Sequence, residues 1–377
     1  MKAKNTERRS YDSQVTSGGF SRTVRLDSLT GLRFFAALAV FMHHAAAYQR
    51  SPEWFGFLAN AGDAGVSFFF MLSGFVLSWS AKNDDTVGRF YQRRAARILP
   101  MYWIAWIPGA IYAVTFEDSK LSSLIPSLLL MQSWFPQKDV HFAGNSVGWS
   151  LSTEVFFYLL FPLFFVAVRN LSTRWITFAL VGSLVFVITI PLALRPTAPV
   201  GDGYWLIYLF PITRFFEFAA GVTLAILMRH GLRVRLPFAL AGAIALAVCV
   251  GANWLPLYLL LVVATAVPFL LLIGSAANAD LAGRRTLMSW RPLVKLGEWS
   301  FAFYLVHLIV LRVVIAMNER TFMLPWWATS LIALLLGLIL AAGLFEFLEK
   351  PLERRFRPTP MKVSPEANLP TGSSVIR

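Results

Sequence analysis

The chain has 377 residues, of which 57% are hydrophobic and 14% charged, and its mean hydropathy is +0.60. Soluble domains carry about 25% charged and about 45–50% apolar residues, so the composition excludes a soluble enzyme and a disordered chain. The single cysteine, Cys249, excludes an intramolecular disulfide and a cysteine-rich metal site, and we expect no bound metal. A net charge of +14 is typical of a protein that binds nucleic acid or an anionic surface. The positions of the basic residues along the chain decide between these two partners.

Ten apolar stretches are long enough to cross a bilayer, which takes about 20 residues of a helix that bonds its own backbone groups. A further apolar run, Leu121–Trp134, is short and contains Pro126, so we interpret it as an interfacial or re-entrant segment. The predicted fold is therefore all-α, a polytopic membrane protein with about ten transmembrane helices. The ten stretches are residues 29–48, 62–80, 98–116, 147–168, 175–194, 204–228, 236–252, 255–273, 299–317 and 326–348.

The distribution of lysine and arginine orients these helices. With the N-terminus in the cytoplasm, 26 of the 34 basic residues fall in cytoplasmic segments, and every inner loop is more basic than its outer neighbours. The charge thus indicates an N-in/C-in protein whose partner is a lipid bilayer, not nucleic acid. The polar segments 1–28 and 358–377 are expected to be flexible cytoplasmic tails around one transmembrane domain, residues 29–357.

Ionisable residues inside the spans mark candidate sites, because each costs at least about 2.5–3.5 kcal/mol at a helix centre. Arg33 and His44 in the first span are close to three helical turns apart and share a helix face. Arg33 falls near the cytoplasmic end and His44 in the outer half, while His43 points about 100° away from that face. The alternative is an interfacial histidine with satisfied hydrogen bonds.

Two further ionisable residues lie in other spans. Glu154 falls near the depth of His44 in the fourth span, where a carboxylate orients a histidine and raises its basicity. The alternative for Glu154 is an ion pair that joins two helices. His307, near the middle of the ninth span, is either a second acid–base group or a hydrogen-bonding residue of the bundle interior.

Arg214 and Glu217 are spaced i,i+3 near the middle of the sixth span, so they can pair along one face of the helix. We interpret them either as a self-neutralising structural pair or as residues that face a polar cavity.

The loop after the second span is rich in arginine from Arg89 to Arg97. Arg94 and Arg97 project together from the start of the third span, and guanidinium groups bind phosphates bidentately. The cluster therefore favours a phosphate-bearing ligand. The alternative is a basic loop that sets the topology and contacts anionic lipids.

Seven short motifs occur in order along the spans. Arg33 and His44 form an Arg-x10-His pattern, Gly65–Phe75 contains a Phe-Phe-x-Leu-Ser-Gly-Phe segment, and Arg94–Arg97 is an Arg-x-x-Arg motif. Over about residues 25–357, the set resembles the acyltransferase-3 family of membrane O-acyltransferases. The remaining four motifs are Trp149–Tyr158, Arg214–Gly221, Tyr304–His307 and Glu349–Arg355.

This resemblance implies transfer of an acyl group from acyl-coenzyme A, with acetyl-coenzyme A as the expected co-substrate, to a hydroxyl group of a sugar or glycan. His44 is then expected to act as general base with Glu154 to orient it, and a covalent acyl-histidine step is the alternative. The residues expected at the site are His44 and Glu154 for catalysis, Arg33, Arg93, Arg94 and Arg97 for the donor, and Ser73, Arg214, Glu217 and His307 as further candidates.

One position departs from the family pattern. Many members have an aspartate in a Gly-Val-Asp-x-Phe-Phe segment, where this chain has Ser67. If that aspartate assists the histidine elsewhere, another group must do so here, and Glu154 is the candidate.

Two other functions remain open at this point. The first two spans are similar in sequence both to exopolysaccharide acetyltransferases and to macrolide acyltransferases of this family. O-acylation of a macrolide is therefore the alternative reaction. An alternative of another class is a secondary transporter, in which the membrane-embedded His, Glu and Arg side chains form a proton or substrate path.

Overall fold

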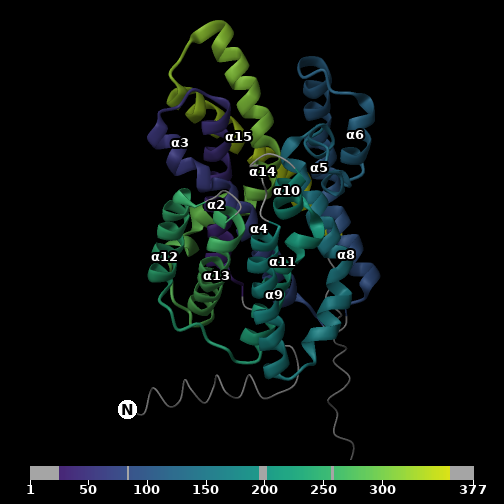
Figure 1. Cartoon of the computed structure of the whole chain (residues 1–377), viewed down its shortest axis with the longest axis vertical. Helices are drawn as coiled ribbons and strands as arrows, with labels where there is room; N and C mark the ends of the chain where they lie inside the picture. Colours follow the sequence, from purple (N-terminus) through teal and green to yellow (C-terminus); the bar gives the residue numbers. More distant parts are fainter. Residues whose placement is uncertain (1–24, 83–84, 195–201, 256–258, 357–377) are drawn as a thin grey trace, which may run out of the picture.

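The computed structural model describes residues 25–82, 85–194, 202–255 and 259–356. Every regular element in these ranges is a helix, which confirms the predicted all-α class. The helices form a bundle, with α6 (Leu121–Leu128) near one end of it (Figure 1). Of the two predicted tails, residues 1–24 and 358–377 lie outside the described residues.

Nine helical segments in the described ranges are long and apolar enough to cross a membrane, so the chain is a multi-pass membrane protein. They correspond to nine of the ten predicted spans. The helices that form them are α2 (Asp27–Tyr48), α3 (Glu53–Asn60) followed by α4 (Ala64–Ser80), α5 (Val87–Phe116), α8 (Trp149–Arg169), α9 (Thr173–Ala193), α11 (Pro211–Arg229), α13 (Thr265–Leu281), α14 (Arg291–Met317), and α15 (Trp326–Leu344) with α16 (Lys350–Arg355).

The predicted span 236–252 is shorter than expected. It forms α12 (Phe238–Gly251) and a 3-10 turn, Ala252–Trp254, which together are an apolar helix of less than span length. Such a segment of 17 residues is about 26 Å long, against about 30 Å for the hydrocarbon core. Pro237 stands directly before α12 and fixes its start, because proline cannot donate a backbone hydrogen bond.

Other boundaries also differ from the sequence prediction. α5 begins at Val87 and α14 at Arg291, both well before the predicted apolar spans. The reason in α5 is a cap: the Thr86 side chain accepts a hydrogen bond from the backbone N–H of Arg89, so the polar first turns stay helical. The predicted short segment after the third span forms α6 and a 3-10 turn, and α7 (Lys138–His141) follows.

Two glycines bring α4 and α11 into backbone contact. A Cβ added at Gly74 would lie 3.0 Å from the Phe218 carbonyl carbon, and one added at Gly221 would lie 2.8 Å from the Met71 carbonyl carbon. Small residues at such crossings let membrane helices approach closely. The crossing places the cavity-lining face of α4 deep in the bundle.

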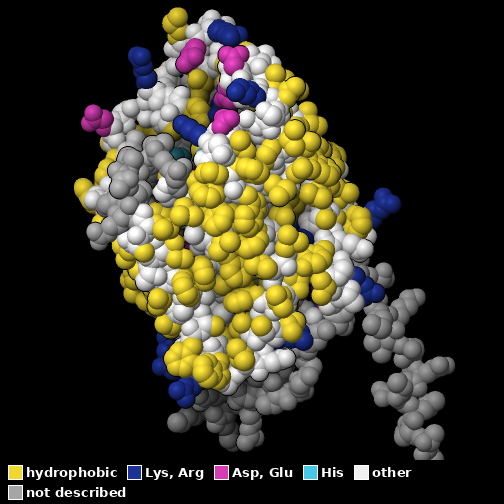
Figure 2. Space-filling view, turned by 45° about the vertical axis from the view of Figure 1, so that its right-hand side comes forward, with side chains coloured by type: hydrophobic (Ala, Val, Ile, Leu, Met, Phe, Trp, Pro, Cys, Tyr) yellow, Lys and Arg dark blue, Asp and Glu magenta, His cyan; other side chains and the backbone are white. Residues whose placement is uncertain are grey.

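The surface agrees with a protein that lies in lipid. Hydrophobic side chains cover the middle of the face seen in Figure 2, whereas charged side chains lie mostly toward its ends. Large apolar side chains such as Leu163 and Ile339 are exposed, as expected where the neighbours are acyl chains.

Candidate active site

Two cavities lie on either side of a shared wall inside the bundle. The inner cavity, on the side of the predicted cytoplasmic helix ends, has a volume of about 120 Å³, and the outer cavity has about 1000 Å³. Val66 of α4 and Tyr304 of α14 line both. The hydroxyl groups of Tyr304 and Ser150 are hydrogen-bonded at 2.8 Å, which holds the phenol at this wall.

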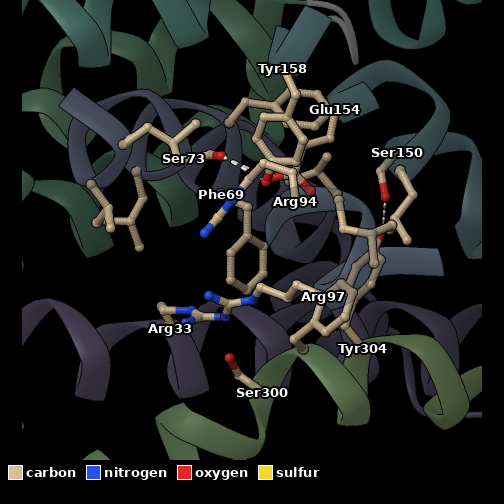
Figure 3. Close-up of a pocket in the computed structure, with 18 residues that line it drawn as sticks. Arg33, Phe69, Ser73, Arg94, Arg97, Ser150, Glu154, Tyr158, Ser300 and Tyr304 are labelled. Atoms are coloured by element: carbon tan, nitrogen blue, oxygen red, sulfur yellow. Dashed lines mark hydrogen bonds between the residues drawn. The ribbon is translucent and has the colours of Figure 1, made fainter. Parts of the chain in front are cut away.

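Three guanidinium groups line the inner cavity (Figure 3). Nε of Arg97 lies 3.6 Å from Oε1 of Glu349, and Nη1 of Arg97 lies 3.3 Å from Oε1 of Glu353, both in the C-terminal helical segment. Arg33 and Arg94 form no ion pair or hydrogen bond with any other described residue, and Nε of Arg94 is buried without a partner. Two of the three guanidinium groups are therefore available to an anionic ligand that enters the cavity.

The structure does not bring Arg93 to this cavity. Its side chain pairs with Asp85 at the end of the preceding loop. Arg93 and Arg97 are spaced i,i+4 and lie on nearly the same face of α5, so the ion pair with Asp85, and not the helical period, holds the Arg93 side chain away from the cavity. The expectation that Arg93 binds the donor is not met by this geometry.

Glu154 lies in the inner cavity, within a small hydrogen-bonded group. Its carboxylate accepts a hydrogen bond from Oγ of Ser73 at 2.8 Å and another from the hydroxyl of Tyr158 (Figure 3). Ser73 was a candidate from the sequence, and the structure gives it this carboxylate as its partner. Tyr158 was missed, although it follows Glu154 by one helical turn.

The expected contact between Glu154 and His44 does not form, and helix depth is the reason. Ser150 of α8 lies at the wall, bonded to Tyr304, and Glu154 follows it by four residues on a helix that runs inward. It therefore lies about 6 Å further inward. His44 lines the outer cavity, on the other side of the same wall.

The partner of His44 is a second histidine. Nδ1 of His44 lies 3.1 Å from Nε2 of His307 and 2.9 Å from the carbonyl oxygen of Val40. Nδ1 of His307 lies 2.7 Å from the carbonyl oxygen of Tyr304 and must donate to it. In a neutral His307 the Nε2 atom is then an acceptor, so Nδ1 of His44 is the donor. Nε2 of His44 keeps the lone pair of a base and has no partner among the residues described.

Arg214 and Glu217 form the ion pair that their spacing predicts. Nη2 of Arg214 lies 3.1 Å from Oε2 of Glu217, and both side chains are fully buried. Arg214 also donates a hydrogen bond to Oγ of Ser67 at 2.9 Å. Neither member of the pair lines the inner or the outer cavity. Ser67, the position that departs from the family pattern, thus contacts Arg214 of this pair.

No group of three His, Cys, Asp or Glu side chains that could hold a metal ion occurs in the described part of the chain. The residues that can hold a ligand in the inner cavity are guanidinium groups, which suit an organic phosphate.

The fold and the site define a multi-pass membrane protein in which an arginine-lined inner cavity meets an outer cavity lined by His43 and His44. Residues 26–346 match the model of the acyltransferase-3 family, which is described as an acyltransferase domain. The chain belongs to this family.

Individual relatives agree with this assignment. The chain is 38% identical over 312 residues to the acyltransferase MdmB of Streptomyces mycarofaciens, a match to 77% of this chain and 80% of that protein. It is 31% identical over 310 residues to the exopolysaccharide production protein ExoZ of Rhizobium meliloti, covering 78% and 91%. It is 28% identical over 359 residues to the putative peptidoglycan O-acetyltransferase YrhL of Bacillus subtilis, covering 87% of this chain but 55% of that protein. No solved structure matches the chain.

Proposed function

We propose that this protein is a membrane O-acyltransferase that moves an acyl group, in the first instance acetyl, from acyl-coenzyme A to a hydroxyl group of a carbohydrate or glycan. One observation carries the proposal: the Nε2 atom of His44 has no partner among the described residues. His44 lines the outer cavity, which shares a wall with the arginine-lined inner cavity. Family membership supports acyl transfer, and similarity to an exopolysaccharide production protein, ExoZ, and a putative peptidoglycan O-acetyltransferase, YrhL, supports a glycan acceptor.

The arrangement of the inner cavity supports coenzyme A as the carrier of the acyl group. Arg33 and Arg94 can hold phosphates bidentately, and Arg97 adds positive charge beside them. Arg33 and His44 lie on one helix about 16 Å apart, a distance that an extended pantetheine arm can follow. The acyl thioester would then reach the wall at Val66 and Tyr304.

The chemistry needs one base at this wall. Nε2 of His44 takes the proton of the acceptor hydroxyl as its oxygen attacks the thioester carbonyl carbon. The carbon–sulfur bond then breaks, an ester forms, and the proton passes from the His44 imidazolium to the thiolate of coenzyme A. The Val40 carbonyl and His307, which both accept from Nδ1 of His44, hold His44 in the required tautomer.

The proposed setting is the cytoplasmic membrane of a bacterium. The basic residues gather at the predicted inner helix ends. Acyl-coenzyme A would enter the inner cavity from the cytoplasm, and the acceptor would enter the outer cavity.

Purified protein in detergent, supplied with radiolabelled acetyl-coenzyme A and a panel of glycans, tests the proposal. We expect a labelled ester and free coenzyme A from the wild type and neither from His44→Ala. His230→Gln is the matched control, because His230 is exposed at the inner end of α11, outside both cavities. Full activity in His44→Ala would refute the mechanism, whereas a wild type that forms no ester would refute the function.

The same assay separates the two alternatives. A macrolide added to the panel becomes the labelled product if O-acylation of a macrolide is the reaction. A transporter would give no labelled product with any acceptor.

A further inference from the structure

A second histidine lines the outer cavity beside His44. The sequence places His43 on another face of the helix, but in the structure both side chains border this cavity. Nε2 of His43 lies 3.3 Å from Oδ2 of Asp63, and their side chains are 22% and 18% exposed. The imidazole–carboxylate pair that the sequence predicts for His44 and Glu154 is thus found at His43 and Asp63.

The position of Asp63 is set by contacts other than its ion pair with His43. A Cβ added at Gly62 would lie 2.8 Å from the carbonyl carbon of Ala39, so the lack of a side chain lets this turn approach α2 closely. The hydroxyl of Tyr208 donates a hydrogen bond to the backbone carbonyl of Asp63 at 2.8 Å. The carboxylate is therefore held beside His43 by the packing of α2 and by a residue that precedes α11.

This pairing determines which atom of His43 is free. A carboxylate is only an acceptor, so Nε2 of His43 donates to Asp63. Nδ1 of His43 has no partner within the described ranges, and the same holds for Nε2 of His44. The two rings lie with their centroids 5.5 Å apart at an angle of 80°. His43 and His44 therefore each have one ring nitrogen without a described partner, and both residues line the outer cavity. Asp63 holds the first ring and His307 holds the second.

We propose that His43, oriented by Asp63, binds a second hydroxyl group of the acceptor, adjacent to the hydroxyl that His44 deprotonates. A hydroxyl both donates and accepts, so it can bond Nδ1 of His43 in either protonation state of the ring. The site then selects acceptors with neighbouring hydroxyl groups, as on a sugar ring, over isolated alcohols. This inference rests on the proposed function of the outer cavity as the acceptor site.

Two substitutions separate orientation from binding. His43→Gln keeps an amide near the position of Nε2, opposite Asp63, but removes the group at Nδ1. Asp63→Asn keeps the shape of the side chain and loses the fixed acceptor for His43. We expect each to raise the KM for the acceptor about tenfold, the effect of one lost hydrogen bond, and to leave the KM for acetyl-coenzyme A unchanged. The acceptor KM of the double variant should be no higher than that of either single variant, because Asp63 acts only through its bond to His43.

The acceptor probes are methyl hexosides and the matching monodeoxy hexosides, with radiolabelled acetyl-coenzyme A and protein that elutes as a single peak in detergent. The wild type should prefer the hexoside about tenfold in kcat/KM over the form that lacks the adjacent hydroxyl. His43→Gln should lose that preference, and His230→Gln should keep it.

Three results would overturn the inference. They are an unchanged acceptor KM in His43→Gln, equal use of hexoside and deoxyhexoside by the wild type, and a wild type that acylates an isolated hydroxyl of a macrolide but no hexoside. In the first two cases His44-dependent transfer to a sugar hydroxyl can persist, so the proposed function stands. The third case also replaces the proposed glycan acceptor by a macrolide. Loss of all transfer in the wild type is the separate result that refutes both.

Discussion

His44 and His307, which are 263 residues apart in the sequence, form a hydrogen bond of 3.1 Å between their rings at the wall of the outer cavity. The Val40 carbonyl oxygen, 2.9 Å from Nδ1 of His44, already fixes the tautomer of His44, and the bond to His307 fixes the orientation of the His44 ring. In the proposed reaction His307 is therefore a positioning residue for His44.

His307→Leu should lower kcat by about tenfold with little change in the KM for either substrate, because the His44 ring keeps its tautomer through the Val40 carbonyl but loses the bond that orients its Nε2 lone pair. His307→Gln should retain more activity, since its amide oxygen can accept from Nδ1 of His44. Steady-state kinetics of the three proteins test this. Equal loss of kcat in both variants, without loss of folding, would contradict the orienting role of His307.

The inner arginines are expected to differ in their effects on the donor. Arg94→Ala should raise the KM for acetyl-coenzyme A about tenfold or more, the loss of a charge-assisted contact, and leave the acceptor KM unchanged. Arg93→Ala is the matched control, since Arg93 pairs with Asp85 outside the cavity. A similar rise in both variants would show a general effect of surface charge and not a binding site.

Arg97→Ala should have a second effect, because Arg97 is the ion-pair partner of Glu349, whose side chain is buried. An unpaired buried carboxylate is costly, so the melting temperature should fall together with the affinity for the donor. Arg94→Ala should leave the melting temperature nearly unchanged. Thermal unfolding of both variants in detergent measures the difference.

Glu154→Gln is expected to affect the donor side. Glu154 lines the inner cavity with Ser73 and Tyr158, so the variant should raise the KM for acetyl-coenzyme A several-fold and leave that for the acceptor unchanged. Tyr158→Phe, which removes one hydrogen bond to this carboxylate, should act in the same direction but more weakly. A change confined to the acceptor would restore the pairing with His44 that the sequence predicts.

The close crossing of α4 and α11 predicts a stability effect. Gly74→Ala and Gly221→Ala should each destabilise the fold by about 1–3 kcal/mol, because the added methyl group meets the backbone of the facing helix. Gly182→Ala in α9 is the control, since nothing lies within 4 Å of an added Cβ there. Melting temperatures of the three variants in detergent test this prediction. An equal shift in all three would argue against a close backbone contact between α4 and α11.

The buried pair of Arg214 and Glu217 predicts strong coupling. Glu217→Gln leaves Arg214 buried without its counter-charge and should destabilise the protein by about 3–5 kcal/mol. The double variant Arg214→Met with Glu217→Leu should recover most of that loss and retain transfer activity, because neither residue lines a cavity. Loss of activity in a well-folded double variant would assign the pair a role in the reaction.

The sequence predicts the members of the candidate site better than it predicts which of them contact one another. Arg33, His44, Ser73, Arg94 and Arg97 line the cavities because polar groups are costly in the membrane and concentrate where they are used. Glu154 was identified for the same reason and was assigned to the wrong cavity. His43 was set aside because one helix gives no information about the cavity that bends around its neighbouring faces.

The sequence by itself determined the all-α class, nine of the ten spans and the shared helix of Arg33 and His44. Lipid offers no partner to backbone groups, so apolar length alone specifies a helix, and the helical period specifies which residues share its face. Only the tertiary structure decided that His44 meets His307, that Glu154 meets Ser73 and that His43 meets Asp63. Those contacts depend on the depth and rotation of one helix against another. Close crossings such as Gly74 with Phe218 set both, and no local periodicity encodes them.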